Sequence, residues 1–429
     1  MSAFDKVIGY ETIKSELLQL CDMIQNPMLY SKLGAKLPKG LLLYGNPGLG
    51  KSLMAKCFIE ESGLTAYTIR RNSNNNDFIT TITGTFEKAK GESPVIVFLD
   101  DIDKFANEDN EHKDAEEYVA VQSGIDDVSD HNIFVIATAN DLEKLPKSLI
   151  RPGRFDRQIH VHNPSPDDAV LIIRHYLADK MLSASVNMDD LSKMISYRSC
   201  AELETILNEA AITAAYRRKE SIEMEDLVDS VLRREYDSPD IFSDSSDQDL
   251  RKAAIHETGH LVVCESLIPG SVGLASVRLS GRESQRGFIN HCKKLKKESD
   301  DILILLAGKA ALDLYYADGA SNGCSSDIRR AKCIIARSIC ENGERGFGFV
   351  DASVYDDYLV DPGSELMLSR NETVIQSELE RYTTMAKTIL IKNRAFLEKI
   401  AAALIEKATL LYSDISEIKR SVGFVESLQ

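Results

Sequence analysis

The sequence predicts an α/β fold with a doubly wound parallel sheet over residues 1–163 and mainly helical structure beyond it. Three uninterrupted apolar runs support this prediction: GLLLYG at 40–45, VIVFLD at 95–100 and NIFVIATAN at 132–140. Such runs are typical of strands buried on both faces of a parallel sheet. Helical patterns lie between them, so strands and helices alternate as in doubly wound folds.

The rest of the chain divides at two changes of composition. NPSPDD, which starts at Asn163, combines chain breakers with helix-start acids, and AELETILNEAAITAAYRR after it places its apolar residues on one helical stripe. The acidic, serine-rich DSPDIFSDSSDQD is typical of a linker. We therefore expect an α/β domain, a small helical domain, a linker and a largely helical domain with one β region near 271–291, with the bounds 1–163, 164–236, 237–250 and 251–429.

The composition excludes some classes of protein. The 429 residues are 43% hydrophobic, which is enough for two or three domains with full cores. A formal charge of -16 makes nucleic acid an unfavourable partner. The eight cysteines form no C-x-x-C pair, which favours reduced thiols in a cytosol-like compartment.

We expect neither a signal peptide nor a membrane span. The N-terminus lacks a basic start followed by an apolar stretch, and the longest apolar runs are shorter than the about 20 residues that a span needs. The sequence therefore predicts a soluble, cytoplasmic chain. Membrane association through a missing anchor or a partner remains an alternative.

The stretch GNPGLGKS fits the phosphate-loop pattern G-x-x-x-x-G-K-[ST] in full. It follows the apolar run GLLLY and precedes a helical pattern, which is the context that the motif requires. We expect its backbone N–H groups to hold the phosphates of ATP, Lys51 to reach the β- and γ-phosphates and Ser52 to bind Mg²⁺. The nucleotide-binding residues are then Gly45, Asn46, Pro47, Gly48, Leu49, Gly50, Lys51 and Ser52. The alternative is a glycine-rich turn without a ligand.

Polar side chains end the other two apolar runs. Asp100 is expected to bind Mg²⁺, and Asp101 to polarise the attacking water. Asn140 could orient that water at the level of the γ-phosphate. The alternative for the two acids is a cap on the following turn.

Three arginines crowd the segment RPGRFDR at 151–157. Taken alone, the segment is typical of a solvated basic loop. If the chain is an ATPase, a more specific interpretation is that one of these guanidinium groups contacts the γ-phosphate bound by a neighbouring subunit.

The stretch HETGH fits H-E-x-x-H. On a helix, His256 and His260 lie on one face and can bind one zinc ion, while Glu257 can accept the proton of a water molecule. The alternative is two structural histidines on a core helix. A third ligand is needed, and His291, Asp313 and Asp327 are candidates among which the pattern does not choose. Asp327 also fits an ordinary acid at a helix start.

KLGAKLPKGLLLYGNPGLGKSLMAK, VIVFLDDID, IATAN and LIRPGRFDRQI together resemble an AAA+ ATPase module. The resemblance implies an α/β nucleotide domain with a helical lid, assembled as a ring that is usually a hexamer. It also implies arginine fingers that act in trans at Arg151 and Arg154, and a sensor asparagine at Asn140.

AAIHETGH, LAGKAALDLYY and GASNGCSSDIRRAKCIIARSI, behind that module, resemble the protease domain of the FtsH-type AAA+ zinc metalloproteases. The resemblance implies Asp327 as the third zinc ligand, with Asp313 as second choice. It implies an ATP-dependent zinc endopeptidase, with one Zn²⁺ per subunit, that feeds polypeptides to the HETGH site.

The chain departs from this family in three places. The sequence begins at the AAA+ module, whereas family members typically have N-terminal transmembrane helices, so we expect either a naturally soluble member or one whose anchor was removed or lost. Asp101 stands where the family usually has glutamate. Asn74, Asn75 and Asn76 stand where the family has an aromatic pore loop. Two alternatives therefore stay open: a remodelling ATPase or regulator with weak or ATP-uncoupled peptidase activity, and a zinc peptidase whose AAA+ ring mainly gates or assembles it.

Overall fold

The computed structural model describes residues 2–71, 78–106, 115–128, 130–151, 153–238, 247–281, 285–293, 297–316, 323–340 and 365–426. The chain divides into two compact units. The first unit comprises Met1–Asp179 with Tyr197–Thr205, and the second comprises Lys180–Ser196 with Ile206–Gln429. The domain bounds at 163, 236 and 250 stay predictions.

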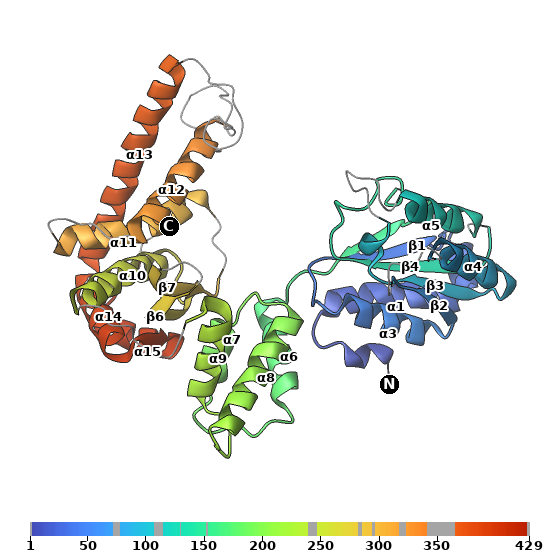
Figure 1. Cartoon of the computed structure of the whole chain (residues 1–429), viewed down its shortest axis with the longest axis horizontal. Coiled ribbons are helices and arrows are strands. Elements are labelled where there is room, and N and C mark those ends of the chain that lie inside the picture. The colour runs from blue at the N-terminus through green and yellow to red at the C-terminus, as the bar shows by residue number, and fades with distance from the viewer. Residues whose placement is uncertain are drawn as a thin grey trace. The chain divides into compact units, whose positions relative to one another are not determined.

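The first unit is built on a five-stranded parallel sheet with the order β2-β3-β4-β1-β5 (Figure 1). The predicted α/β fold class is therefore confirmed, and each of the three apolar runs forms a strand. All residues of β3 and β4 are buried, as their uninterrupted apolar sequences require. The strands are β1 (Gly40–Tyr44), β2 (Thr65–Ile69), β3 (Val95–Leu99), β4 (Ile133–Ala139) and β5 (Arg157–His160).

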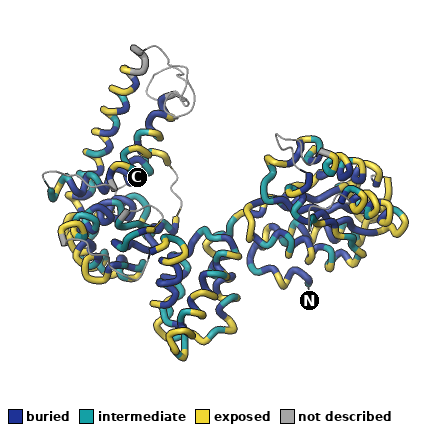
Figure 2. The backbone as a smooth tube through the Cα atoms, viewed as in Figure 1, coloured by how far each residue is buried: buried dark blue, intermediate teal, exposed yellow. Residues whose placement is uncertain are grey.

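Helices cover both faces of this sheet. Helix α3 packs on β1 and β4 and is itself covered by α1, whereas α4 packs on β2 and β3 and is covered by α5. The buried strands and exposed outer helix faces are visible in Figure 2. The helical elements are η1 (Ala3–Lys6), α1 (Glu11–Gln25), α2 (Pro27–Lys32), α3 (Lys51–Ser62), α4 (Phe78–Gly91), η2 (Ile102–Lys104), α5 (Ala115–Asp127) and α6 (Pro166–Leu177).

The second unit is mainly helical around a small antiparallel sheet with the order β7-β6-β8. Strands β6 and β7 confirm the β region predicted near 271–291. The strands are β6 (Val272–Ser280), β7 (Gln285–His291) and β8 (Thr409–Leu411). The helices are α7 (Met188–Met194), α8 (Cys200–Tyr216), which begins in the first unit, α9 (Met224–Tyr236), α10 (Asp247–Leu267), α11 (Glu298–Tyr315), α12 (Gly323–Cys340), α13 (Glu365–Lys392), α14 (Arg394–Lys407) and α15 (Tyr412–Ser421).

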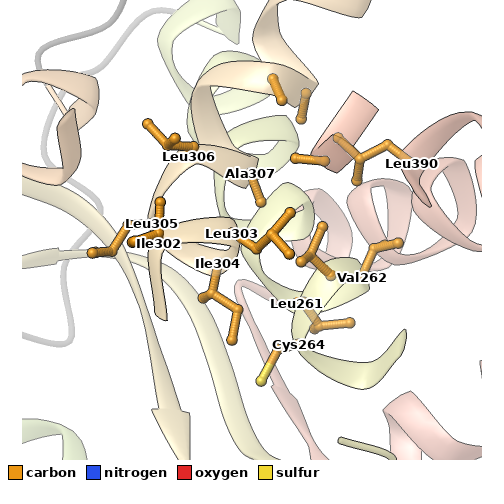
Figure 3. Close-up of a cluster of buried hydrophobic side chains, with 14 of the residues drawn as sticks. Leu261, Val262, Cys264, Ile302, Leu303, Ile304, Leu305, Leu306, Ala307 and Leu390 are labelled. Carbon is orange, nitrogen blue, oxygen red and sulfur yellow. The ribbon is translucent and has the colours of Figure 1, made fainter. Parts of the chain in front are cut away.

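Helices α10 and α11 form the centre of the core of the second unit. Leu261 and Val262 of α10 pack with Leu303 and Ala307 of α11, and Leu390 of α13 belongs to the same cluster (Figure 3). Fully burying each leucine stabilises the fold by about 1.5–3 kcal/mol. The two helices approach closely because Gly259 has no side chain: a Cβ atom there would lie 2.5 Å from the carbonyl oxygen of Ala307.

None of the helices in the described ranges is both long and apolar enough to cross a membrane.

Candidate metal and nucleotide sites

The phosphate-loop sequence connects the carboxyl end of β1 to the first turn of α3. Gly48 and Gly50 adopt φ angles of 79° and 83°, which favour glycine, and the loop curls so that Lys51 is buried. Lys51 Nζ donates to the carbonyl oxygens of Gly45 and Asn46 at 2.7 and 2.8 Å and to Oδ1 of Asn140 at 2.9 Å. Burial lowers the pKa of Lys51, although the nearby acids at 100, 101 and 103 oppose this effect.

Ser52 and Asp100 meet at the carboxyl ends of the parallel strands. Ser52 Oγ donates to Oδ1 of Asp100 at 2.7 Å, and Thr138 Oγ1 donates to the same oxygen at 2.8 Å. Asp100 is only 4% exposed, so these hydrogen bonds satisfy a buried carboxylate. Oxygen ligands of this kind fit Mg²⁺. The sequence reasoning missed Thr138, although a polar residue in the buried run FVIATA was a visible signal.

Asp101 and Asn140 also lie close together. Asn140 Nδ2 donates to Oδ1 of Asp101 at 3.5 Å, while Lys104 Nζ donates to Oδ2 of Asp101 at 2.6 Å. Asp103, which the sequence reasoning missed, accepts from the backbone N–H of Asn140 at 3.2 Å. The predicted phosphate-side residues therefore form one connected hydrogen-bond network.

The two predicted arginine fingers differ in their surroundings. Arg154 is 4% exposed and donates to Asp126 through Nε at 2.8 Å and Nη2 at 2.7 Å, and to the carbonyl oxygen of Ser148 at 2.6 Å. Its guanidinium holds the pKa of Asp126 below the usual range. Arg151 is exposed. Arg154 is thus held within its own unit, and Arg151 is at the surface.

The metal-site candidates converge from two helices. His256 and His260 lie one turn apart on α10, and the first turns of α12 bring Asp327 to them. Oδ2 of Asp327 lies 3.2 Å from Nε2 of His256 and 3.3 Å from Nε2 of His260. In the described part of the chain, this is the one group of three or more histidine, cysteine or acidic residues that could hold a metal ion.

Neighbouring groups fix the orientation of both imidazoles. His260 Nδ1 lies 2.6 Å from the carbonyl oxygen of Ile304, so this nitrogen carries the proton and Nε2 keeps its lone pair. Cys324 Sγ lies 3.8 Å from Nδ1 of His256. Gly308 makes room for both rings, since a Cβ atom there would lie 2.4 Å from Cε1 of His256 and 2.5 Å from Nε2 of His260. The sequence reasoning did not identify Gly308.

His256, His260 and Asp327 shift one another's pKa values because their side chains lie in contact. Burial would raise the pKa of Asp327, but its bonds to the two imidazoles outweigh burial and hold the pKa well below the usual range. Burial lowers the pKa of His256. For His260, burial is outweighed by Asp327 and Glu257, and the pKa is raised. Two imidazole nitrogens and one carboxylate fit zinc and leave a coordination position open, as catalytic zinc sites require.

Glu257 lies beside this group, on α10, and is 6% exposed. The backbone of β7 borders its carboxylate: a Cβ atom at Gly287 would lie 2.5 Å from Oε1 of Glu257. Gly287 has a φ of 96°, so both its conformation and the space require glycine. No sequence pattern that we used singled out Gly287.

The other two candidate ligands point to other partners. Asp313 accepts hydrogen bonds from Lys309 and, at 2.9 Å, from Lys387. His291 Nδ1 lies 3.2 Å from Sγ of Cys264. The structure therefore brings Asp327, and neither of these two, to the histidine pair. Asn74, Asn75 and Asn76, expected at the pore loop, lie outside the described residues.

The fold and site together define a nucleotide-binding ATPase module joined to a metallopeptidase-like module, and comparisons with known proteins agree. Residues 41–163 match the family described as "ATPase family associated with various cellular activities (AAA)", and residues 244–418 match "Peptidase family M41". Similar proteins include the "ATP-dependent zinc metalloprotease FtsH" of Caldicellulosiruptor bescii, 30% identical over 95% of this chain and 70% of the relative. The Thermus thermophilus protein of the same name is 30% identical over 97% of this chain and 70% of the relative. The chain belongs to the FtsH family of ATP-dependent zinc metalloproteases.

Proposed function

We propose that this chain is an ATP-dependent zinc endopeptidase that feeds polypeptides to the HETGH site. The observation that carries the proposal is the meeting of His256, His260 and Asp327 beside the carboxylate of Glu257. Zinc would be held by Nε2 of each histidine and by a carboxylate oxygen of Asp327. When bound, zinc supplies Lewis acidity that lowers the pKa of a water molecule and polarises the scissile carbonyl.

The chain's own residues then have distinct roles in peptide hydrolysis. Glu257 accepts a proton from the attacking water and donates it to the leaving amine. Ile304 holds His260 in the tautomer whose Nε2 faces the metal position. The backbone of β7 at Gly287 limits where the Glu257 carboxylate can lie, and this keeps the base close to the reacting water.

The nucleotide site supplies the energy for substrate transport. The phosphate loop would hold ATP, with Lys51 at its β- and γ-phosphates, and Ser52 and Asp100 would hold Mg²⁺. Asp101 and Asn140 orient the attacking water, and their mutual hydrogen bond keeps the two polar groups on one side of the site.

Assembly into a homo-hexameric ring would bring an arginine to the ATP of the neighbouring subunit. Arg151, which is exposed, is the better candidate for this finger. Arg154, bound to Asp126 and Ser148, would support the loop that carries Arg151.

A second function, a remodelling ATPase with weak or ATP-uncoupled peptidase activity, is favoured by two features of the motor. Asp101 is shorter than the family's glutamate by one methylene, and a displacement of about 1 Å can cost on the order of 10²-fold in rate. The asparagines at 74–76 also offer no aromatic grip on a polypeptide.

One comparison separates these functions. Casein cleavage and ATP turnover are measured for the intact chain, Glu257→Gln and Lys51→Ala. The proposal expects ATP-stimulated cleavage by the intact chain, ATP turnover without cleavage by Glu257→Gln, and loss of ATP stimulation in Lys51→Ala. Equal survival of casein with the intact chain and Glu257→Gln would contradict the peptidase. Cleavage at the full rate by Lys51→Ala would favour the uncoupled alternative.

A further inference from the structure

Helix α9 ends directly against the strand that borders Glu257. The ring of Tyr236, its last residue, stacks on Phe288 of β7 with 3.8 Å between ring centroids and 10° between planes. Asn290, on the same face of β7, donates to the Tyr236 hydroxyl at 3.3 Å. A stacked pair fixes the relative position of two elements more narrowly than aliphatic contacts do, because its favourable geometries are few.

Backbone hydrogen bonds reinforce this junction. The carbonyl oxygen of Tyr236 accepts from Ser280 Oγ at 3.0 Å and from the N–H of Gly281 at 3.2 Å. Gly281 follows β6 and leads towards β7. The last turn of α9 therefore contacts β6, Gly281 and β7 through main chain as well as side chains.

A second junction lies at α7. Asp190, which is 3% exposed, accepts from the N–H of Ser413 at 2.8 Å and from its hydroxyl at 2.7 Å. The backbone of α7 also approaches β6 so closely that a Cβ atom at Gly273 would lie 2.3 Å from the carbonyl oxygen of Lys193. Helix α7 is thus bound to α15 through Ser413 and packed against β6, at a point separate from the α9 junction.

The neighbour of Phe288 in β7 is Gly287, whose backbone borders the Glu257 carboxylate. Gly287 and Phe288 share one planar peptide unit, so the stack that holds Phe288 also restrains the main chain next to Gly287. The stack with Tyr236 and the contact with Glu257 lie on consecutive residues of one strand. Loss of the stack therefore removes a restraint on the backbone that borders the Glu257 carboxylate.

We propose that the stack of Tyr236 on Phe288 positions Glu257 for catalysis. This inference rests on the proposed function and adds two positioning residues to it. Tyr236 and Phe288 act on the base through the backbone of β7 at Gly287.

The test uses a short unstructured fluorogenic peptide, because its cleavage needs no unfolding. With ATP present, kcat, KM and zinc content are measured for the intact chain, Phe288→Leu, Tyr236→Leu and the double variant. Tyr236→Phe keeps the stack and removes only the hydroxyl. The matched control is Tyr216→Leu, since Tyr216 of α8 is 83% exposed.

Each leucine variant is expected to lose about ten-fold in kcat, with little change in KM and zinc content, because the base is displaced by a fraction of an ångström. The double variant should lose no more than either single variant, because all three break one stack. Tyr236→Phe and Tyr216→Leu should keep the kcat of the intact chain.

Unchanged kcat in both single variants would overturn the inference. If Phe288→Leu does not fold, Tyr236→Leu removes the same stack from the end of a helix and decides the matter. Intact chain and Glu257→Gln are assayed in parallel. A peptide cleaved equally by these two contradicts the proposed function, whereas a difference between them together with unaffected stack variants contradicts only this inference.

Discussion

Oδ2 of Asp327 lies 3.2 Å from Nε2 of His256, although the two residues belong to different helices. Helix α12 must pack against α11 and α13 for this contact to form, and those helices hold the core around α10. The metal-binding geometry is therefore a product of the folded core of the second unit. Substitutions at this contact, or in the core that supports it, should impair metal binding and leave the nucleotide site unchanged.

Gly308→Ala should impair the metal site without touching a ligand. The added Cβ atom would lie within 2.5 Å of atoms in both imidazole rings, so the rings must move. We expect a loss of peptidase activity on the order of 10²-fold and weaker zinc binding, measured by peptide cleavage and zinc titration. Gly84→Ala is the control, since a Cβ atom on that exposed helical glycine meets nothing within 4 Å. Full activity in Gly308→Ala would contradict this reading of the site.

Arg151→Ala and Arg154→Ala should fail in different ways. Arg151→Ala should lower ATP turnover by about 10³-fold or more, as loss of an arginine finger does, and leave the melting temperature unchanged. Arg154→Ala removes three hydrogen bonds of a buried guanidinium and should destabilise the first unit by about 1.5–3 kcal/mol. ATPase assays and thermal unfolding distinguish the two. Reversed results would assign the finger to Arg154.

Asp226 should make the stability of the second unit depend on pH. Burial would raise its pKa, but bonds from Lys219, at 2.9 Å, and Arg217, at 3.1 Å, outweigh it and hold the pKa below the usual 3.8. A lowered folded-state pKa means that the charged form stabilises the fold above about pH 4, and that this contribution is lost as pH falls through the folded-state pKa.

Asp226→Asn should therefore cost about 1.5–3 kcal/mol at neutral pH, and its difference from the intact chain should shrink as pH falls below about 4. Hydrogen exchange in α9 measures this locally. Glu225→Gln is the control, because Glu225 is exposed and its carboxylate lies 3.8 Å from Nζ of Lys219, which is beyond hydrogen-bond distance. A cost for Asp226→Asn that does not change with pH would show that the charge is not the cause.

The sequence was sufficient to predict the parallel sheet, because strands buried on both faces leave long apolar runs. It also predicted that His256 and His260 share a helix face, which follows from helical periodicity. The choice of Asp327 over Asp313 rested on family resemblance, because no local pattern reveals which distant acid reaches α10. Asp327 reaches the histidines only through the packing of α12 against α11 and α13.

The sequence indicated little about residues whose role depends on contacts with distant segments or on a special backbone conformation. Gly308 and Gly287 are glycines because of side chains far from them in sequence, and Arg154 is buried on an acid of another helix. The position of Tyr236 at the end of a helix does not predict that its ring stacks on Phe288. Such partners become visible only when the elements are packed.

Zinc content is the most direct test of the central claim that His256, His260 and Asp327 form one metal centre. The intact chain, Asp327→Asn and Asp313→Asn are purified identically and analysed for metal. The account predicts about one zinc per chain for the intact protein and Asp313→Asn, and a small fraction of that for Asp327→Asn. Equal zinc content in Asp327→Asn and the intact chain would contradict it.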